Sequence, residues 1–443
     1  MYLHGTSKIN AQGHLEIGGV DATDLKEQFG TPLYVVDEQL VRERCREYME
    51  AFRASGLGFQ VAYASKAFCV MAMCALAAEE GLSLDVVSDG ELFTALQAGF
   101  PAERIHFHGN NKTLEEIEMA LDAEIGCFVV DNFNELHLLQ AVAADKNRKV
   151  NILLRVTPGV EAHTHEYIST GQTDSKFGFD IGNGTAFEAI ELASKQSNLV
   201  LLGVHSHIGS QIFEVEGFQM AVQRVAEFAA DVHERLNVAF KVVNLGGGFG
   251  IRYIDGDTPL EVSQYVRAIT DAVKNHFAQI GYAVPEIWVE PGRSIVGEAG
   301  TTLYTVGTSK DIPGVRKYVA VDGGMTDNPR PALYESKYEA VLANRANEAA
   351  QETVSVAGKC CESGDMLIWD LDLPKVQSGD LLAVACTGAY NYSMASNYNR
   401  IRRPAVVFVK DGQGDVVVRR ETYQDIIQND LVPERIAKQP VIR

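Results

Sequence analysis

Residues 59–66 read FQVAYASK, an apolar strand-like stretch that ends in a lysine, and an apolar helical run follows at 67–78. Lysine is rarely buried, so Lys66 either reaches water along its aliphatic stem or is placed at the strand end for its amine. A desolvated amine loses its proton more readily and can attack a carbonyl carbon to form a Schiff base. For an isolated lysine the first interpretation is the commoner one, so the choice depends on the rest of the chain.

Strand-like runs of this kind recur and alternate with amphipathic helical stretches. The expected strands are 59–65, 82–88, 105–109, 127–131, 150–158, 201–209, 240–248 and 286–292. Alternation of strands and helices indicates parallel strands with right-handed crossovers. Eight such units over about 235 residues match the size of a (β/α)8 barrel. A doubly wound open sheet is the competing arrangement, but it rarely runs to eight evenly built units.

The pattern changes after about residue 294, where turn-separated strand-like runs replace the strand–helix units. Runs such as TTLYTVGTS and AVVFVKDG predict an antiparallel β domain. The segment KINAQGHLEIGG at 8–19 looks like a hairpin that belongs to the same domain. We therefore expect an α/β protein. Residues 1–35 form the N-terminal segment of the β domain, 36–293 a (β/α)8 TIM-type barrel, and 294–443 the C-terminal antiparallel β domain.

Composition narrows the class of partners. The 443-residue chain carries a formal net charge of −20, and such a surface repels phosphate backbones, so nucleic acid is not expected as a partner. Seven cysteines without regular spacing suit a reducing compartment. The first residues lack the apolar core of a signal peptide, and the longest apolar run, 70–78, is too short to cross a bilayer. We expect a cytoplasmic protein without a membrane partner.

The ends of the predicted strands carry a dense set of polar residues. In (β/α)8 barrels the chemistry sits at the C-terminal ends of the strands. Read in order, these ends supply Lys66, 85–88, His108, Asp131, Arg155, His205, His207, 246–248, Glu290 and Arg293. The glycines at 246–248 either let backbone N–H groups approach a phosphate or form a plain flexible turn. Glu290 is either part of a surface turn or a buried carboxylate that needs a partner.

His205 and His207 raise the possibility of a metal site, because residues two apart on a strand share one face. Metal-dependent barrel hydrolases use such a pair, but on the first strand rather than the sixth, and no further histidine set is well placed here. We expect no metal. One of the two histidines suits the face of a flat cofactor, and the other is plausible as a satisfied core residue.

Two loops of the β domain are rich in reactive side chains. Residues 358–365 read GKCCESGD and 388–393 read GAYNYS. A buried cysteine usually acts as a small apolar residue, but two cysteines in a polar loop that contains glycine indicate a site. The segment NPRPALY at 328–334 adds an arginine fixed between two prolines.

These motifs together resemble the diaminopimelate decarboxylase family, which are pyridoxal-phosphate enzymes of the alanine-racemase-like fold. The motifs that carry the resemblance are YASKA, HSHIGSQ, LGGGFG, EPGRS, NPRPALY, CCESGD and GAYNYSMASNYN. Each is modest evidence alone. All seven in the order of the family, spread nearly from end to end of the chain, are specific.

The resemblance implies a cofactor, pyridoxal 5'-phosphate, and a role for each motif residue. Lys66 would attach the cofactor, His207 would stack on its ring and Glu290 would bind its pyridine nitrogen. The full implied cofactor set is Lys66, His207, Ser210, Gly246, Gly247, Gly248, Glu290, Pro291, Gly292, Arg293 and Tyr390. A carboxylate on the ring nitrogen keeps a proton there, which favours decarboxylation over racemisation.

The resemblance also implies a substrate site that two chains complete. Arg293, Arg330, Tyr334, Glu362 and Tyr390 would bind substrate, and Lys66, Cys361 and His207 would be catalytic. Cys361 and Glu362 would act across the interface of a homodimer. The implied reaction is decarboxylation of meso-2,6-diaminopimelate at its D-centre to L-lysine and CO2, the last step of lysine biosynthesis. Cys360 receives no role, and a long polar loop at 163–179 is a candidate for closing over the site.

Three other functions compete. A decarboxylase for ornithine, arginine or carboxynorspermidine would share the fold, but the segment with Arg330 and Tyr334 argues against it, since those substrates offer no distal carboxylate to an arginine. A non-catalytic relative that binds a partner protein should have lost the lysine or the cysteine. The third alternative is the metal-dependent hydrolase.

Overall fold

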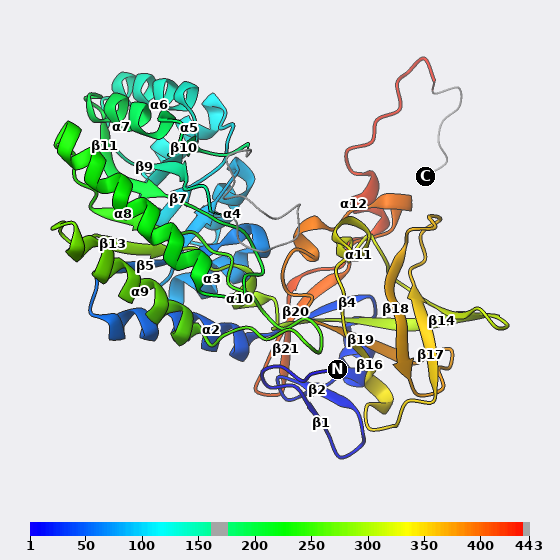
Figure 1. Cartoon of the computed structure of the whole chain (residues 1–443). Coiled ribbons are helices and arrows are strands. Elements are labelled where there is room, and N and C mark those ends of the chain that lie inside the picture. Colours follow the sequence, from blue (N-terminus) through cyan, green and yellow to red (C-terminus); the bar gives the residue numbers. More distant parts are fainter. Residues whose placement is uncertain (161–175, 437–443) are drawn as a thin grey trace.

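The chain folds into a barrel and a β-rich domain that lie side by side (Figure 1). The computed structural model describes residues 1–160 and 176–436. Most of the loop at 163–179 therefore lies outside the described residues, and its expected closing motion stays a prediction.

Eight parallel strands close the barrel, and all eight were predicted from the sequence. They are β5 (Phe59–Ala64), β6 (Ser83–Val86), β7 (Ile105–Phe107), β8 (Cys127–Val130), β9 (Val150–Thr157), β11 (Leu199–His205), β12 (Val242–Asn244) and β13 (Glu286–Val289). Each pairs in parallel with its neighbour, and β13 pairs with β5 to close the ring. A short extra strand, β10 (Phe179–Asp180), pairs in parallel with the end of β9.

Helices cover the outside of the barrel. They are α2 (Glu38–Ser55), α3 (Met71–Glu79), α4 (Asp89–Gln97), α5 (Leu114–Asp122), α6 (Phe133–Asp145), α7 (Thr185–Ser194), α8 (Glu216–Leu236) and α9 (Val262–Gln279). Several begin a few residues after a strand because a capping side chain is in place. Ser88 caps α4, Thr113 forms a capping box with Glu116 at the start of α5, and Asn132 caps α6.

The second domain is built on a long central strand, β14 (Gly300–Ile312). Around it lie β4 (Leu33–Asp37), β15 (Arg316–Val321), β16 (Ala340–Leu342), β17 (Glu352–Ala357), β18 (Met366–Leu373), β19 (Leu381–Ala385), β20 (Ala405–Lys410) and β21 (Gln413–Val418). Most pairs are antiparallel, as expected. The exceptions are β15–β17 and β4–β20, which pair in parallel because long excursions of the chain separate their strands.

The N-terminal segment belongs to the β domain, as its hairpin pattern suggested. Strands β1 (Lys8–Ile9), β2 (Leu15–Ile17) and β3 (Val20–Asp21) form a small antiparallel sheet that leads into α1 (Ala22–Phe29). Leu15 and Ile17 are fully buried in an apolar cluster with Leu33 and Val407. The chain therefore starts in the β domain, forms the barrel and then returns.

The mouth of the barrel faces the β domain. After β13 the short helix α10 (Arg293–Val296) leads directly into β14. The backbone N–H of Tyr390 donates to the carbonyl of Ala67, next to Lys66, at 2.8 Å, and the N–H of Gly388 donates to the carbonyl of Gly297 at 3.1 Å. Two further short helices of the β domain, α11 (Arg330–Tyr334) and α12 (Tyr423–Ile427), complete the fold.

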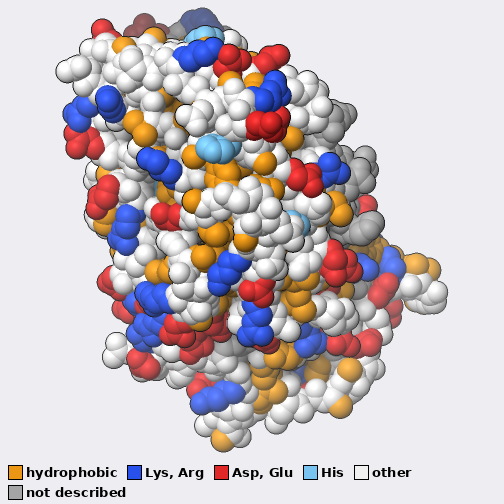
Figure 2. Space-filling model, turned by 60° about the vertical axis from the view of Figure 1, so that its left-hand side comes forward, with side chains coloured by type: hydrophobic (Ala, Val, Ile, Leu, Met, Phe, Trp, Pro, Cys, Tyr) orange, Lys and Arg blue, Asp and Glu red, His pale blue; other side chains and the backbone are white. Residues whose placement is uncertain are grey.

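The surface is mixed in charge. On the face shown in Figure 2, acidic and basic side chains are interspersed among apolar and neutral ones. Within the described residues, every helix is too short or too polar to cross a membrane.

A buried ion pair connects the loops beside the barrel mouth. Lys112 Nζ donates to Glu135 Oε1 at 2.7 Å and to the carbonyls of Gly109 and Val129. Both charged side chains are almost inaccessible, at 1% and 3%. The second oxygen of Glu135 accepts the N–H of Asp131 at 2.9 Å. The pair therefore holds the ends of β7 and β8 against α6.

We predict that Lys112→Met destabilises the fold by about 3–5 kcal/mol, because it leaves the Glu135 charge buried without its partner. The double variant Lys112→Met, Glu135→Leu removes both charges and should recover a large part of this loss. Urea unfolding of the three proteins measures the difference. Equal stability of the single and double variants would contradict the prediction.

Candidate active site

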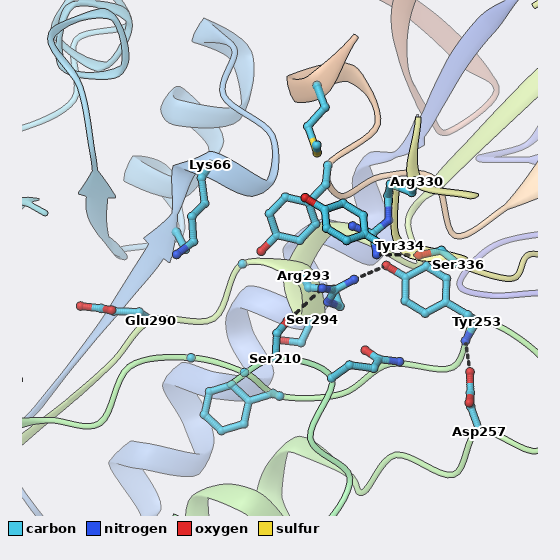
Figure 3. Close-up of a pocket in the computed structure, with 18 of the residues that line it drawn as sticks. Lys66, Ser210, Tyr253, Asp257, Glu290, Arg293, Ser294, Arg330, Tyr334 and Ser336 are labelled. Atoms are coloured by element: carbon cyan, nitrogen blue, oxygen red, sulfur yellow. Dashed lines mark hydrogen bonds between the residues drawn. The ribbon is translucent and has the colours of Figure 1, made fainter. Parts of the chain in front are cut away.

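A cavity of about 590 Å3 opens between the barrel mouth and the β domain. Its lining residues are Ala64, Lys66, Asp85, His207, Ser210, Gln211, Gly247, Gly248, Phe249, Tyr253, Ile254, Asp257, Glu290, Gly292, Arg293, Ser294, Arg330, Tyr334, Glu335, Ser336, Lys337, Tyr390 and Met394. Figure 3 shows Lys66 and Glu290 on the barrel side and Arg330 and Tyr334 on the opposite side, with Arg293 between them. The cavity thus brings together residues from most of the motifs.

Lys66 lies in a single 3-10 turn, Ser65–Ala67, directly after β5. Its side chain projects into the cavity, where solvent can reach it although protein surrounds it. Burial lowers the pKa of the amine, but Asp85, Tyr390 and Glu290 outweigh that effect, so the pKa is raised overall. The expectation of an amine that loses its proton through desolvation is therefore wrong for this structure, because the neighbouring acids were not visible from the local sequence.

Glu290 is a buried carboxylate that four strand ends share. Asn244 Nδ2 donates to its Oε1 at 2.6 Å, His205 Nε2 lies 3.0 Å from Oε2, and His108 Nε2 lies 3.0 Å from Oε1. Burial alone would raise the pKa of this carboxyl, but His108 and His205 hold it well below its usual range. Glu290 is therefore ionised and able to hold a proton on a basic nitrogen in the cavity.

Asp85 lies beside this cluster, where Glu290, His108 and Lys66 act on its carboxyl. Burial raises the pKa of its carboxyl, and Glu290 adds to the rise, while His108 and Lys66 oppose it. Two nearby carboxyls therefore differ in their affinity for a proton, as expected for like charges in one buried site.

The two histidines of the HSH motif have separate surroundings. His205 is almost fully buried and contacts Glu290 through Nε2, but its Nδ1 has no hydrogen-bond partner among the described residues, so it is a core residue that is satisfied at one nitrogen only. His207 lines the cavity, and its Nδ1 accepts the N–H of Gly247 at 3.2 Å. Burial and the nearby Lys66 and Arg155 charges lower the pKa of His207 well below its usual value, so its ring is neutral.

One group of side chains in the described residues could bind a metal ion. Nitrogen atoms of His108 and His205 and an oxygen of Glu290 all lie within 4.8 Å of one another. This is a different set from the pair His205 and His207 that the sequence suggested. His108 Nε2 and His205 Nε2 already lie 3.0 Å from the two different oxygens of Glu290, so the cluster is equally explained as a charged carboxylate with two histidine partners.

The glycine run after β12 presents bare backbone to the cavity. A Cβ on Gly247 would lie 2.2 Å from the carbonyl oxygen of Glu290, and one on Gly248 would lie 2.4 Å from that of Gly209. Gly248 also has a φ of +102°, which L-residues with side chains rarely adopt. Glycine is therefore required for the backbone to pass this close to the neighbouring strand ends and leave room for an anion.

Two buried guanidinium groups face the cavity. Arg293 donates from Nη1 to Tyr253 Oη at 2.6 Å and from Nη2 to Ser210 Oγ at 2.9 Å. Arg330 donates from Nε to Tyr338 Oη at 3.0 Å. Both side chains are less than a tenth exposed, and within 1–160 and 176–436 neither forms an ion pair with a carboxylate.

Because a buried unpaired charge is costly, the two arginines require anionic ligands. The two cations also share an aromatic neighbour. The ring of Tyr390 lies 4.9 Å from the guanidinium of Arg293 and 5.4 Å from that of Arg330, which stabilises both cations in part but does not neutralise them.

Cys361 and Glu362 do not line this cavity. Both are exposed on the loop between β17 and β18. Cys360, next in the chain, is half-buried, and burial together with the facing Asp365 carboxylate raises the pKa of its thiol to about 12. Cys360 is therefore a poor proton donor or nucleophile at neutral pH.

The structure places most of the predicted site residues together. Gly246 and Pro291 lie behind the lining, where their carbonyls accept the N–H groups of Glu290 and Ala64. Sequence reasoning missed Tyr253, Ser336 and Tyr338, which come from irregular segments without a motif. Asn244 could have been found, because it ends a predicted strand just before the glycine run.

Comparisons with a family model and with known proteins point to the same group of decarboxylases. The family described as "Pyridoxal-dependent decarboxylase, pyridoxal binding domain" matches residues 38–297. The chain is 62% identical over 431 residues to the diaminopimelate decarboxylase of Bacillus subtilis (strain 168), covering 97% of this chain and 98% of that protein. It is 50% identical to the enzyme of the same name from Staphylococcus aureus (strain COL), over 96% and 99% of the two chains.

The chain belongs to the diaminopimelate decarboxylase family.

Solved structures of the family have the same fold. The crystal structure of diaminopimelate decarboxylase from M. jannaschii in complex with L-lysine superimposes with a TM-score of 0.92 at 38% identity, covering 98% of this chain and all of that one. The lysine/ornithine decarboxylase of Vibrio vulnificus matches with a TM-score of 0.75 at 24% identity, which shows the shared fold alone.

The residues of the cavity fit the pyridoxal phosphate of this family. A reachable amine, an ionised buried carboxylate, a neutral histidine ring and a bare glycine turn line one space. In the same order, these groups can bind the carbonyl carbon, the ring nitrogen, the flat ring and the phosphate of the cofactor.

We predict that Gly247→Ala weakens cofactor binding at least about tenfold, since an added methyl group forces the glycine turn away from the Glu290 backbone. Titration of the cofactor-free protein, followed by absorbance, measures the affinity. Gly307→Ala is the matched control, because its Cβ meets only the Ala320 carbonyl at 3.6 Å. Equal affinity in all three proteins would contradict the role of the turn.

Proposed function

We infer that this chain catalyses the pyridoxal-phosphate-dependent decarboxylation of meso-2,6-diaminopimelate at its D-centre, giving L-lysine and CO2. Family membership at 62% identity supports the reaction. The assignment of the substrate rests on the pair of buried arginines that lie in the same cavity as Lys66 and Glu290. The bound L-lysine of the M. jannaschii relative agrees with lysine as product.

Five groups of this chain would hold the cofactor. Lys66 would bind it covalently, His207 would lie against its ring, Glu290 would hold a proton on its pyridine nitrogen, and the 246–248 turn would receive its phosphate together with Ser210. When bound, pyridoxal phosphate supplies an electron sink for the pair that CO2 leaves behind on Cα. The low pKa of Glu290 serves this purpose, because an ionised carboxylate keeps the nitrogen protonated.

The proposed substrate site follows from charge. Diaminopimelate carries a second carboxylate and a second ammonium at the end remote from the reaction. Arg293 and Arg330 would bind that carboxylate, with Tyr334 beside them. Arg330 and Tyr334 lie across the cavity from Lys66 in Figure 3, and Arg293 lies between the two sides. Ornithine or lysine would leave both arginines unpaired at a desolvated site, which disfavours them as substrates.

The remaining groups would come from a second copy of the chain. Cys361 would return a proton to Cα, and Glu362 would take the distal ammonium, but neither lines the cavity of its own chain. Both are exposed on one loop, and they are free to enter the cavity of a partner. We therefore propose a homodimer in which each β domain completes the site of the other chain.

The proposed division of labour follows the domains. Residues 36–293 would bind the cofactor, while 1–35 and 294–443 would supply Arg330, Tyr334 and the loop for the partner.

All seven cysteines lie in the described residues and are free thiols. This agrees with a proposed cytoplasmic location, where thiols stay reduced.

We predict that the purified protein is yellow and that borohydride bleaches it while fixing the cofactor to Lys66. Reduction of a Schiff base makes the bond permanent, so peptide mass spectrometry locates the label. Lys112, whose amine is buried against Glu135, is the internal control and should stay unlabelled. Colourless protein with stoichiometric zinc at His108, His205 and Glu290 would overturn the cofactor assignment.

We predict that Arg330→Met raises KM for diaminopimelate about 10- to 100-fold, because a charge-assisted hydrogen bond at a buried site contributes about 1.5–3 kcal/mol. Steady-state release of CO2 measures the change. Arg316→Met, which removes a surface arginine of the same domain that stacks on Trp369, is the control and should behave as wild type. Unchanged KM in Arg330→Met would remove this arginine from the substrate site.

A further inference from the structure

Asp365 ends the CCESGD motif and has no role in the site described above. It is 3% exposed and directly precedes β18, at the end of the loop that carries Cys361 and Glu362. Its carboxylate is used twice within the chain. Oδ2 accepts the N–H of Cys360 at 2.7 Å, and Oδ1 accepts the N–H of Met325 at 2.6 Å.

The two N–H groups belong to different functional segments. Cys360 directly precedes Cys361, which we place in the site of the partner. Met325 lies five residues before Arg330, which we place in the site of its own chain. One buried carboxylate therefore joins the segment that serves one site to the segment that serves the other.

The backbone around Asp365 is shaped to receive this carboxylate. A Cβ on Gly324 would lie 2.5 Å from its oxygens, and one on Gly358 would lie 2.2 Å from Oδ2. The N–H of Gly358 donates to the Asp365 carbonyl at 2.9 Å, and the N–H of Asp365 donates to the Glu362 carbonyl at 3.1 Å. Glycine at both positions is what permits the carboxylate to lie between the two segments.

A second side chain fixes the loop from its other side. Asn399 Oδ1 accepts the N–H of Cys361 at 2.8 Å. Asn399 and Arg400 have φ values of +52° and +57°, so the backbone adopts an uncommon conformation where it presents this amide. The amides of Cys360 and Cys361 are thus both held, while the Cys361 thiol stays exposed.

The segment before Arg330 has anchors other than Asp365. Asp327 accepts the N–H of Gly324 at 2.9 Å and the hydroxyl of Tyr304, and Tyr34 donates to its carbonyl. Loss of the Asp365 contact should therefore disturb Arg330 less than it disturbs the Cys361 loop.

We propose that Asp365 is a positioning residue that sets the Cys361–Glu362 loop for the site of the partner and ties it to the Arg330 segment of its own site. The inference rests on the proposed function, because it assigns Cys361 and Arg330 their roles in the reaction. Asp365 itself touches neither substrate nor cofactor. It acts by fixing two backbone amides whose neighbours do.

The test uses Asp365→Asn, which keeps the shape but offers one acceptor oxygen and one N–H2 group in place of two acceptors. One of the two backbone N–H groups must then lose its bond. Asp380→Asn is the matched control. Asp380 is also a buried aspartate of the β domain and accepts a backbone N–H, that of Gln377 at 2.8 Å, yet contacts neither segment.

Mixed dimers, purified through two different affinity tags, separate the two effects. The reference dimer pairs a Lys66→Ala chain with a wild-type chain and has one working site. In the first test dimer, the Lys66→Ala chain also carries Asp365→Asn, so the working site receives a disturbed Cys361 loop. We expect kcat to fall about 10- to 100-fold, since a misplacement of about 1 Å is that costly, with KM unchanged.

In the second test dimer, a Lys66→Ala chain is paired with an Asp365→Asn chain. The working site now has an intact Cys361 loop but a disturbed Arg330 segment, so we expect KM to rise severalfold and kcat to stay near the reference. Equal behaviour of the two test dimers, or a shift of the same kind in the Asp380→Asn control, would overturn the proposal.

Hydrogen exchange in the wild-type holoenzyme provides a readout that does not depend on activity or on folding of the variant. If one carboxylate holds both amides, those of Cys360 and Met325 should exchange slowly and at matching rates. Fast or widely different rates would overturn the proposal. A wild-type enzyme without activity toward diaminopimelate would instead refute the proposed function, and the exchange rates would still decide the role of Asp365.

Discussion

The buried charge of Glu290 is the constraint on which the site depends. Glu290 follows β13, and its carboxylate contacts side chains from the ends of three other strands: His108 after β7, His205 of β11 and Asn244 of β12. A charge in this position is tolerable only when its partners are in place. Closure of the barrel supplies them, so the same contacts that satisfy the charge also fix the floor of the cavity and keep the carboxylate ionised.

The rest of the cavity continues the same electrostatic pattern. The acidic Glu290 lies on the barrel side, Arg330 lies on the opposite side, and Arg293 lies between them. Lys66 stands among the acids, which raise the pKa of its amine above what burial alone would give. A ligand with a basic nitrogen at one end and a carboxylate at the other is complementary to this arrangement, and the Tyr390 ring contacts both arginines.

Much of this could be predicted from the sequence, and the reasons are physical. Eight apolar runs, of which the first five are spaced at near-regular intervals, must be buried. Parallel strands with helical crossovers are the arrangement that buries them, so the barrel followed from the pattern. Its geometry then placed Lys66, the glycine run and Glu290 at one end. The prediction failed where an effect came from distant residues. The raised pKa of Lys66 depends on Asp85 and Glu290, and Tyr253, Ser336 and Tyr338 reach the arginines from irregular segments that have no periodic signal.

By itself, the sequence determined the fold class and the family and predicted the reactive side chains, because these depend on local periodicity and on short motifs in a fixed order. Only the tertiary structure decided how the charges balance and which residues share a space. It separated His205, which contacts Glu290, from His207, which lines the cavity. It also placed Cys361 outside the cavity of its own chain and joined its loop to the Arg330 segment through Asp365. Such relations depend on distances between residues far apart in the chain, which no local pattern records.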